Sequence, residues 1–164
     1  MKRMGMVLLC AALMLSCIAC GEGKSPYEYL EDFSHLYPLP AGRMYDSEAG
    51  EGEETYLDPA IFTLLYGRDG WGDDREDIDR FSLFLGTSST HIYEMGIFEC
   101  YDRDGANEIL GLVNTRLSLL IKSNVDADMS AVMGAQVAMF GKCVVYVVLP
   151  DNEKAMRVIE RVVR

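Results

Sequence analysis

The chain has 164 residues, enough for one domain of ordinary size, and carries 15 basic and 26 acidic residues, a formal net charge of −11. This acidic excess argues against nucleic-acid binding, which needs Lys and Arg side chains on phosphates. Divalent cations and cationic partners are compatible with it.

The first twenty residues predict an export signal. Lys2 and Arg3 give a positively charged start, and an almost wholly apolar run, 7–19, follows them. This run is too short for a membrane-spanning helix, which needs about 20 residues, but it suits a signal peptide. We therefore assign 1–19 to a cleaved signal. Its removal leaves 13 basic residues against 26 acidic ones, a net charge of −13.

The end of the apolar run resembles the lipobox of bacterial lipoproteins, in which a cysteine thiol carries a diacylglycerol. Ala19 precedes Cys20, although the Leu usual three places before the lipidated cysteine is Cys17. Cys17 as the attachment point is the alternative, and a plain secreted protein is a third reading. Lipidated Cys20 predicts a protein anchored in the cell membrane on its extracytoplasmic face, with 20–26 as tether and 27–164 as a single domain.

The first part of the domain predicts two short helices and two acidic loops. The first helix, 27–37, ends at the segment YPLPAG, because proline cannot continue a helix; its predicted apolar side is Tyr29, Leu30, Phe33 and Leu36. The stretch from Met44 to Glu54 shows no hydrophobic period and predicts a loop, within an acidic segment, 44–58. A helix over 59–66 follows Asp58, and a second acidic loop spans 67–79.

The second part has regular patterns. It predicts strands over 81–85, 92–101, 136–140 and 143–149, and helices over 106–122 and 152–163. The order strand-strand-helix-strand-strand-helix predicts an α+β two-layer sandwich, in which a largely antiparallel four-stranded sheet carries helices on one face. The run CVVYVVL, 143–149, is apolar at both parities. This indicates a central strand covered on both faces, or a face reserved for a partner.

Polar residues inside these elements favour structural roles. Glu94 lies within a strand, and an ion pair with Arg116, on or near the inner face of the following helix, explains it better than catalysis. His35 and His91 show no sequence-level reason to converge, so a histidine-based hydrolase is not expected. Cys100 and Cys143 are compatible with one disulfide or with two buried thiols.

The acidic loops and their aromatic residues are the candidate functional features. The weak metal candidates are Asp73, Asp74, Asp77 and Asp79, but Ile78 occupies the position where a calcium-binding EF-hand loop needs glycine. A solvated acidic surface is the simpler reading, and no cofactor is predicted. The candidate ligand or partner surface consists of Tyr56, Tyr66, Trp71 and Tyr93, with aromatic packing at the rim of the core as the alternative.

Several segments together resemble one family. They are LYPLPAG, LDPAIFTLLYG, REDIDRFSLFLG, IYEMGIFECYD and FGKCVVYVVLPDNEKA, with the helix that contains Arg116 between the last two. The family is a domain of unknown function in small lipoproteins of Clostridia-type Gram-positive bacteria, and the resemblance covers roughly 36–161. It implies a single domain in the cell envelope and supplies no catalytic or binding residues.

The sequence thus predicts a membrane-anchored extracytoplasmic lipoprotein that acts as a non-catalytic binding or interaction module. Its ligand is an envelope protein or a small molecule. The alternatives are a small cell-envelope hydrolase that uses carboxylates of the acidic loops, and an accessory subunit that docks through an exposed strand face.

Overall fold

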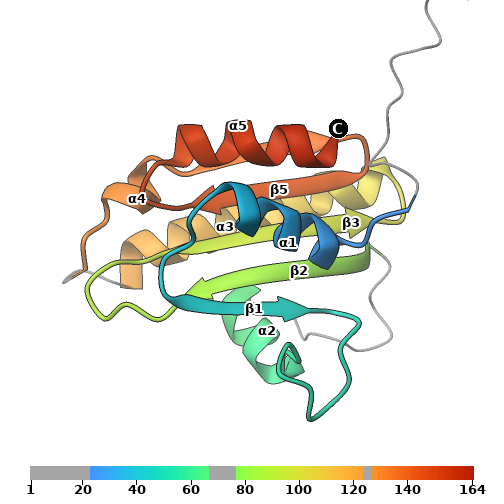
Figure 1. Ribbon diagram of the computed structural model, residues 1–164, viewed down its shortest axis with the longest axis horizontal. Helices are drawn as coiled ribbons and strands as arrows, with labels where there is room; N and C mark the ends of the chain where they lie inside the picture. Colours follow the sequence, from blue (N-terminus) through green and yellow to red (C-terminus); the bar gives the residue numbers. More distant parts are fainter. Residues whose placement is uncertain (1–22, 67–76, 124–126) are drawn as a thin grey trace, which may run out of the picture.

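The computed structural model describes residues 23–66, 77–123 and 127–164 (Figure 1). Within these ranges the strands are β1 (Gly42–Asp46), β2 (Ile78–Gly86), β3 (Glu94–Cys100), β4 (Gln136–Phe140) and β5 (Cys143–Val148). The helices are α1 (Pro26–Leu36), α2 (Pro59–Tyr66), α3 (Arg103–Ser123), α4 (Ser130–Met133) and α5 (Asn152–Val163). The strands form one antiparallel sheet in the order β1-β2-β3-β5-β4. The predicted α+β class is confirmed, with five described strands in place of four.

The additional strand is β1, which lies where the sequence predicted a loop from Met44 onward. It pairs with β2 along one side only, from Gly42 opposite Gly86 to Asp46 opposite Ser82. A short edge strand buries little side-chain surface, so its sequence needs no strong alternation of apolar and polar residues. The absence of a hydrophobic period was therefore a poor guide here.

The helices cover both faces of the sheet, and the prediction that they share one face was wrong. Val144, Tyr146 and Val148 of β5 pack in one hydrophobic cluster with residues of α2, α3 and α4. The alternate residues of β5 pack in a second cluster with α1 and α5. Figure 1 shows α1 and α5 in front of the sheet and α3 behind it. The run of apolar residues in β5 is thus explained by a strand covered on both faces, as one of the two sequence readings proposed.

The helix boundaries follow their capping residues. Ser25 and Glu28 form a reciprocal capping box at the start of α1, and the Asp151 carboxylate accepts a hydrogen bond from the Lys154 N–H at the start of α5. The predicted apolar side of α1 holds except at Leu36, which is 63% exposed. The next residue, Tyr37, is buried instead, and its ring stacks on that of Phe33 with centroids 5.2 Å apart.

Gly141 sets the geometry of the β4–β5 turn. Gly141 has a φ of +63°, which a type II′ turn requires at its first central residue and which glycine adopts without strain. In the part of the chain that the structure describes, every helix is too short or too polar to cross a membrane.

Candidate functional site

Several of the predicted functional residues lie outside the described residues. These are Cys17, Cys20, Trp71, Asp73 and Asp74. The lipid anchor therefore stays a prediction. Among the residues that are described, no three His, Cys, Asp or Glu side chains gather closely enough to hold a metal ion, and Asp77 and Asp79 form no such group.

The predicted aromatic surface is not formed by its described members. Tyr66 is 2% exposed and belongs to the core, where its hydroxyl lies 2.8 Å from that of Tyr146. Tyr56 bridges to Asp46, whereas the carbonyl oxygen of Tyr93 accepts a hydrogen bond from Gly86 N–H. Asp46 lies opposite Ser82, which is four residues from Gly86 in β2. Tyr56 and Tyr93 therefore contact positions about 13 Å apart along the strand. Tyr66 was predicted wrongly because proximity to acids in the chain does not tell which way a side chain points.

A buried polar network lies between the sheet and α3, and it includes the predicted ion pair. Arg116 donates two hydrogen bonds to the Glu94 carboxylate, from Nε at 3.1 Å and from an Nη at 2.7 Å. The Tyr146 hydroxyl donates to Glu94 Oε1 at 3.2 Å. Since the Tyr146 proton is directed at the carboxylate, the Tyr66 hydroxyl must be the donor to Tyr146. The predicted pairing of Glu94 with Arg116 is confirmed.

Burial and the charge of Glu94 shift the pKa values of the other groups in this network. Burial, followed by the charge of Glu94, raises the pKa of both Tyr66 and Tyr146, so both hydroxyls stay protonated. Burial alone would lower the pKa of Arg116, but its hydrogen bonds to Glu94 and the charge of that carboxylate outweigh this and raise it. Arg116 and Tyr146 donate to Glu94, which is 2% exposed, and Tyr66 donates to Tyr146. A carboxylate this deeply buried and hydrogen-bonded within the protein acts as a structural acceptor.

A second ionic cluster lies at the other end of β3. The Glu99 carboxylate contacts Arg80 at 2.7 Å and Lys142 at 3.1 Å, and Arg80 also lies 3.7 Å from Glu48. Burial raises the pKa of Glu99, but the hydrogen bonds and positive charges of Lys142 and Arg80 outweigh it and lower the pKa. This cluster connects β2, β3 and the β4–β5 turn, so it has a stabilising role.

His91 lies in an exposed polar contact that the sequence did not predict. Its Nδ1 is 2.8 Å from the Thr90 hydroxyl, and its Nε2 is 3.6 Å from the Asp128 carboxylate. The ring stacks on Tyr93 with centroids 5.6 Å apart. The imidazole and the carboxylate are each more than 40% exposed. The contact joins the β2–β3 loop to the segment before α4, and it offers no enclosed place for a substrate.

Cys100 and Cys143 are buried and belong to different hydrophobic clusters. Because the two clusters lie on opposite faces of the sheet, the two side chains point apart, which a disulfide does not permit. Burial raises the pKa of the Cys100 thiol to about 12, and the nearby charges of Asp77 and Asp102 add to this. The structure thus selects two buried thiols from the two sequence readings.

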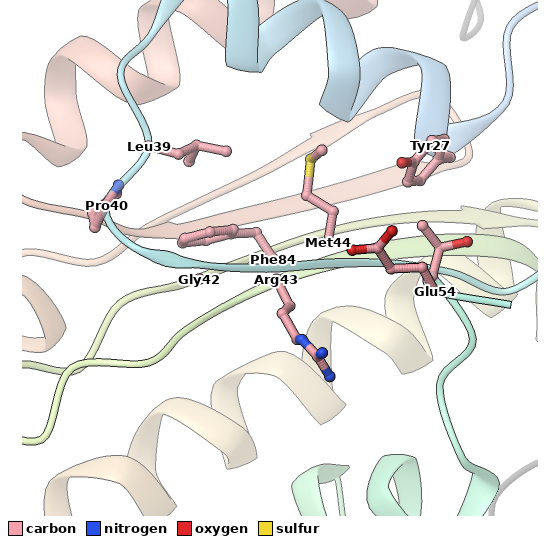
Figure 2. A pocket seen from close by; sticks show the side chains of 9 residues that line it. Tyr27, Leu39, Pro40, Gly42, Arg43, Met44, Glu54 and Phe84 are labelled. Carbon is pink, nitrogen blue, oxygen red and sulfur yellow. The ribbon is translucent and has the colours of Figure 1, made fainter. Parts of the chain in front are cut away.

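The candidate binding site is a pocket of about 380 Å³ at the β1 edge of the sheet, on its α1 side (Figure 2). Its lining comes from the start of α1, the segment before β1, β1 itself, the following loop and β2. These residues are Tyr27, Leu39, Pro40, Gly42, Arg43, Met44, Glu54, Thr55 and Phe84. In Figure 2 the side chains of Leu39 and Met44 lie on the α1 side of β1, whereas Arg43 points to the opposite side.

The pocket runs along backbone that has no strand partner. Ser47 N–H donates to Phe81 O, and Thr87 N–H donates to Ala41 O, so the odd-numbered residues of this segment face β2. The even-numbered ones face outward, as the bond from Asp46 N–H to Thr55 O shows. The N–H and C=O groups of Gly42 and Met44 therefore point to the open side of the edge.

The acidic rim of the pocket consists of Glu54, which lines it, and of Glu31 and Asp46, whose charges act on the lining residue Tyr27. Partial burial raises the pKa of the Tyr27 hydroxyl, and the negative charges of Glu31, Asp46 and Glu54 raise it further. No Lys, Arg or His of the described ranges forms an ion pair with any of these three carboxylates. The sequence identified the acidic segment 44–58, but it did not predict that an edge strand and α1 lie next to it.

A second hollow is lined mainly by basic residues. It has a volume of about 510 Å³ and lies on the outer face of α5, lined by Arg157, Glu160, Arg161 and Arg164. Three of these residues belong to the basic outer stripe that the helical spacing of α5 indicates. The side chains of Arg157, Arg161 and Arg164 are exposed, so the α5 surface offers positive charge to the solvent.

Comparisons with protein-family models, with curated proteins and with solved structures found no match. The resemblance to the domain family of small lipoproteins therefore remains a prediction from the sequence.

Proposed function

We propose that this protein is a membrane-anchored extracytoplasmic lipoprotein that acts as a non-catalytic binding module, with the β1-edge pocket as its binding site. The proposal of an anchor rests on the predicted signal and on Cys20. Ser25 caps α1, so only residues 21–25 separate the anchor from the folded domain. Five residues span at most about 18 Å, which would hold the domain close to the membrane surface.

The observation that supports binding is the combination of features in the edge pocket. Leu39, Met44 and Phe84 give it an apolar floor, and one wall is an open strand edge. The Glu54 carboxylate lines it and has no ion-pair partner among the described residues. Binding sites typically combine an apolar surface with a few directed polar groups in this way. The Glu94 network, in contrast, lies between the sheet and α3, where Glu94 is 2% exposed.

The hydrolase alternative receives less support. A carboxylic acid that donates a proton at neutral pH needs a raised pKa. In the described part of the chain, the carboxyl groups with a resolved shift are Glu99 and Asp128, and both pKa values are lowered. They are lowered by hydrogen bonds and positive charges, which is typical of stabilising contacts.

The anchor can be tested by metabolic labelling with a fatty-acid analogue. We expect the wild-type protein and the Cys17→Ala variant to incorporate label, whereas Cys20→Ala should lose it and leave the membrane fraction. Label retained in Cys20→Ala but lost in Cys17→Ala would move the anchor to Cys17. Label retained in both variants would contradict the lipid anchor.

The pocket can be tested by photo-crosslinking in the protein's own membranes. A photoreactive amino acid at Thr55, which lines the pocket, should give a discrete adduct. The control position is Leu64 on α2, whose side chain is 81% exposed. Equal adducts from the two positions, or none from Thr55, would contradict a binding site at the pocket.

A further inference from the structure

The open edge of β1 offers a short set of hydrogen-bonding groups. The outward N–H and C=O groups of Gly42 and Met44 have no hydrogen-bond partner among the described residues. At one end, Thr55 O already accepts from Asp46 N–H and closes the edge. At the other end, Pro40 has no N–H to offer. Four backbone groups are therefore free, which fits an extended segment of a few residues.

Side chains of an added strand would meet the pocket. Successive side chains of a strand point to opposite faces of the sheet, so every second one would lie on the α1 side. On that side Leu39, Met44 and Phe84 provide apolar contact. Gly42 helps to shape this surface, because a Cβ there would lie 2.4 Å from Cε2 of Phe84.

The charge of the rim selects among occupants. Glu54 lines the pocket, and the negative charges of Glu31, Asp46 and Glu54 all act on Tyr27. No described cation forms an ion pair with these carboxylates, and the lining residue Arg43 points to the opposite side of β1 (Figure 2). An acidic segment would be repelled. A second copy of this chain would bring the same acidic rim and an excess of negative charge of its own. A Lys or Arg side chain would meet complementary charge and could keep its apolar stem on the pocket floor.

We propose that the occupant of the edge pocket is an extended peptide segment of another protein that adds to β1 as a further strand and places a Lys or Arg side chain against the acidic rim. This inference rests on the proposed function, since it names the ligand class of the same pocket. Backbone hydrogen bonds would supply affinity, and the side chain on the α1 side would supply specificity.

The test uses the full lipidated protein in nanodiscs and synthetic heptapeptide pools. Three pools have randomised flanks and carry Lys, Glu or norleucine at the centre. A fourth repeats the Lys pool with alternate backbone nitrogens methylated, which removes the donors needed for strand pairing. We prevent strand pairing by changing the peptide and not the protein, because any side chain at Gly42 would displace Phe84.

We expect the Lys pool to bind best, with the Glu pool weaker by about tenfold and the methylated pool weaker by about tenfold through the loss of ladder hydrogen bonds. Glu54→Gln should reduce binding of the Lys pool by about threefold, and this loss should disappear in high salt. The control Glu108→Gln makes the same charge change on α3, behind the sheet, and should leave binding unchanged.

The outcomes separate the two proposals. Equal binding of the Lys and norleucine pools would refute the charge requirement, and full binding of the methylated pool would refute strand addition. If no pool binds while the Thr55 adduct still forms, the ligand is not a peptide of this kind and the proposed binding site stands. If both the pools and the adduct fail, the proposed function falls with the inference.

Discussion

The carboxylate of Glu94 and the carboxylates at the β1 edge show two different uses of acidic residues in one domain. Glu94 is buried and receives hydrogen bonds from Arg116 and Tyr146. Glu31 and Glu54 are exposed and have no ion-pair partner among the described side chains. A buried charge must be compensated within the protein, whereas water can solvate an exposed one. Only the second kind remains available to a ligand.

The largest effect is expected from breaking the buried pair. Arg116→Met removes both guanidinium hydrogen bonds and leaves the Glu94 carboxyl group buried without its cationic partner, so we expect a loss of about 3–5 kcal/mol in the free energy of unfolding. Urea denaturation measures it. The double variant Glu94→Gln/Arg116→Met removes the charge as well and should recover much of the loss. Equal losses in the single and double variants would show that the unpaired charge is not the cause.

The two tyrosines of the same network should differ in their effect. Tyr146→Phe removes the donor to Glu94 and the acceptor of Tyr66, so we expect a loss of about 2 kcal/mol. Tyr66→Phe removes only the outer hydroxyl, and its expected cost is about 1 kcal/mol. Urea denaturation of both variants gives the comparison. The reverse order would contradict the direction of hydrogen bonding that we assign.

The Glu99 cluster, which is less buried than Glu94, should make a smaller and pH-dependent contribution. Because Lys142 and Arg80 lower the folded-state pKa of Glu99 below its ordinary value of 4.5, its contribution is present above pH 4.5. It is lost as the pH falls through the lowered pKa. Glu99→Gln should therefore cost about 1 kcal/mol at pH 6 and nothing once both proteins are fully acidified. A difference in stability that stays constant down to low pH would contradict the assignment.

Local patterns in the sequence predicted the elements well where side chains are buried on a regular spacing. The helical stripe of α3 and the position of Glu94 in a strand were enough to predict the pair with Arg116. The run in β5 indicated two covered faces. The prediction that all helices lie on one face of the sheet was nevertheless wrong, because the face that a helix covers depends on how distant segments pack. The first helix packs with α5, far along the chain, to cover the face opposite α3.

The edge pocket was beyond sequence reasoning for a related reason. Its walls come from Tyr27 in α1, from the β1 segment and from Phe84 in β2, residues that no local pattern connects. β1 itself has an exposed Gly42 and Arg43 and lacks the alternation of a half-buried strand. The aromatic residues near the acidic segments were the signal that the sequence offered for a binding site. Tyr66 shows its weakness, since burial beside Tyr146 places this residue in the core.

The smallest effect on stability is expected at the acidic rim, and it completes the contrast with Glu94. The variant Glu31→Gln/Glu54→Gln removes two exposed charges that form no ion pair with a described residue, so the free energy of unfolding should change by no more than about 0.5 kcal/mol. Any change should be a gain at low salt, because like charges around Tyr27 are relieved, and it should vanish at high salt, where exposed charges are screened. Urea denaturation at two salt concentrations measures both. A loss above about 1 kcal/mol would mean that these carboxylates stabilise the fold as Glu94 does, and the rim would then not be free to receive a cationic side chain.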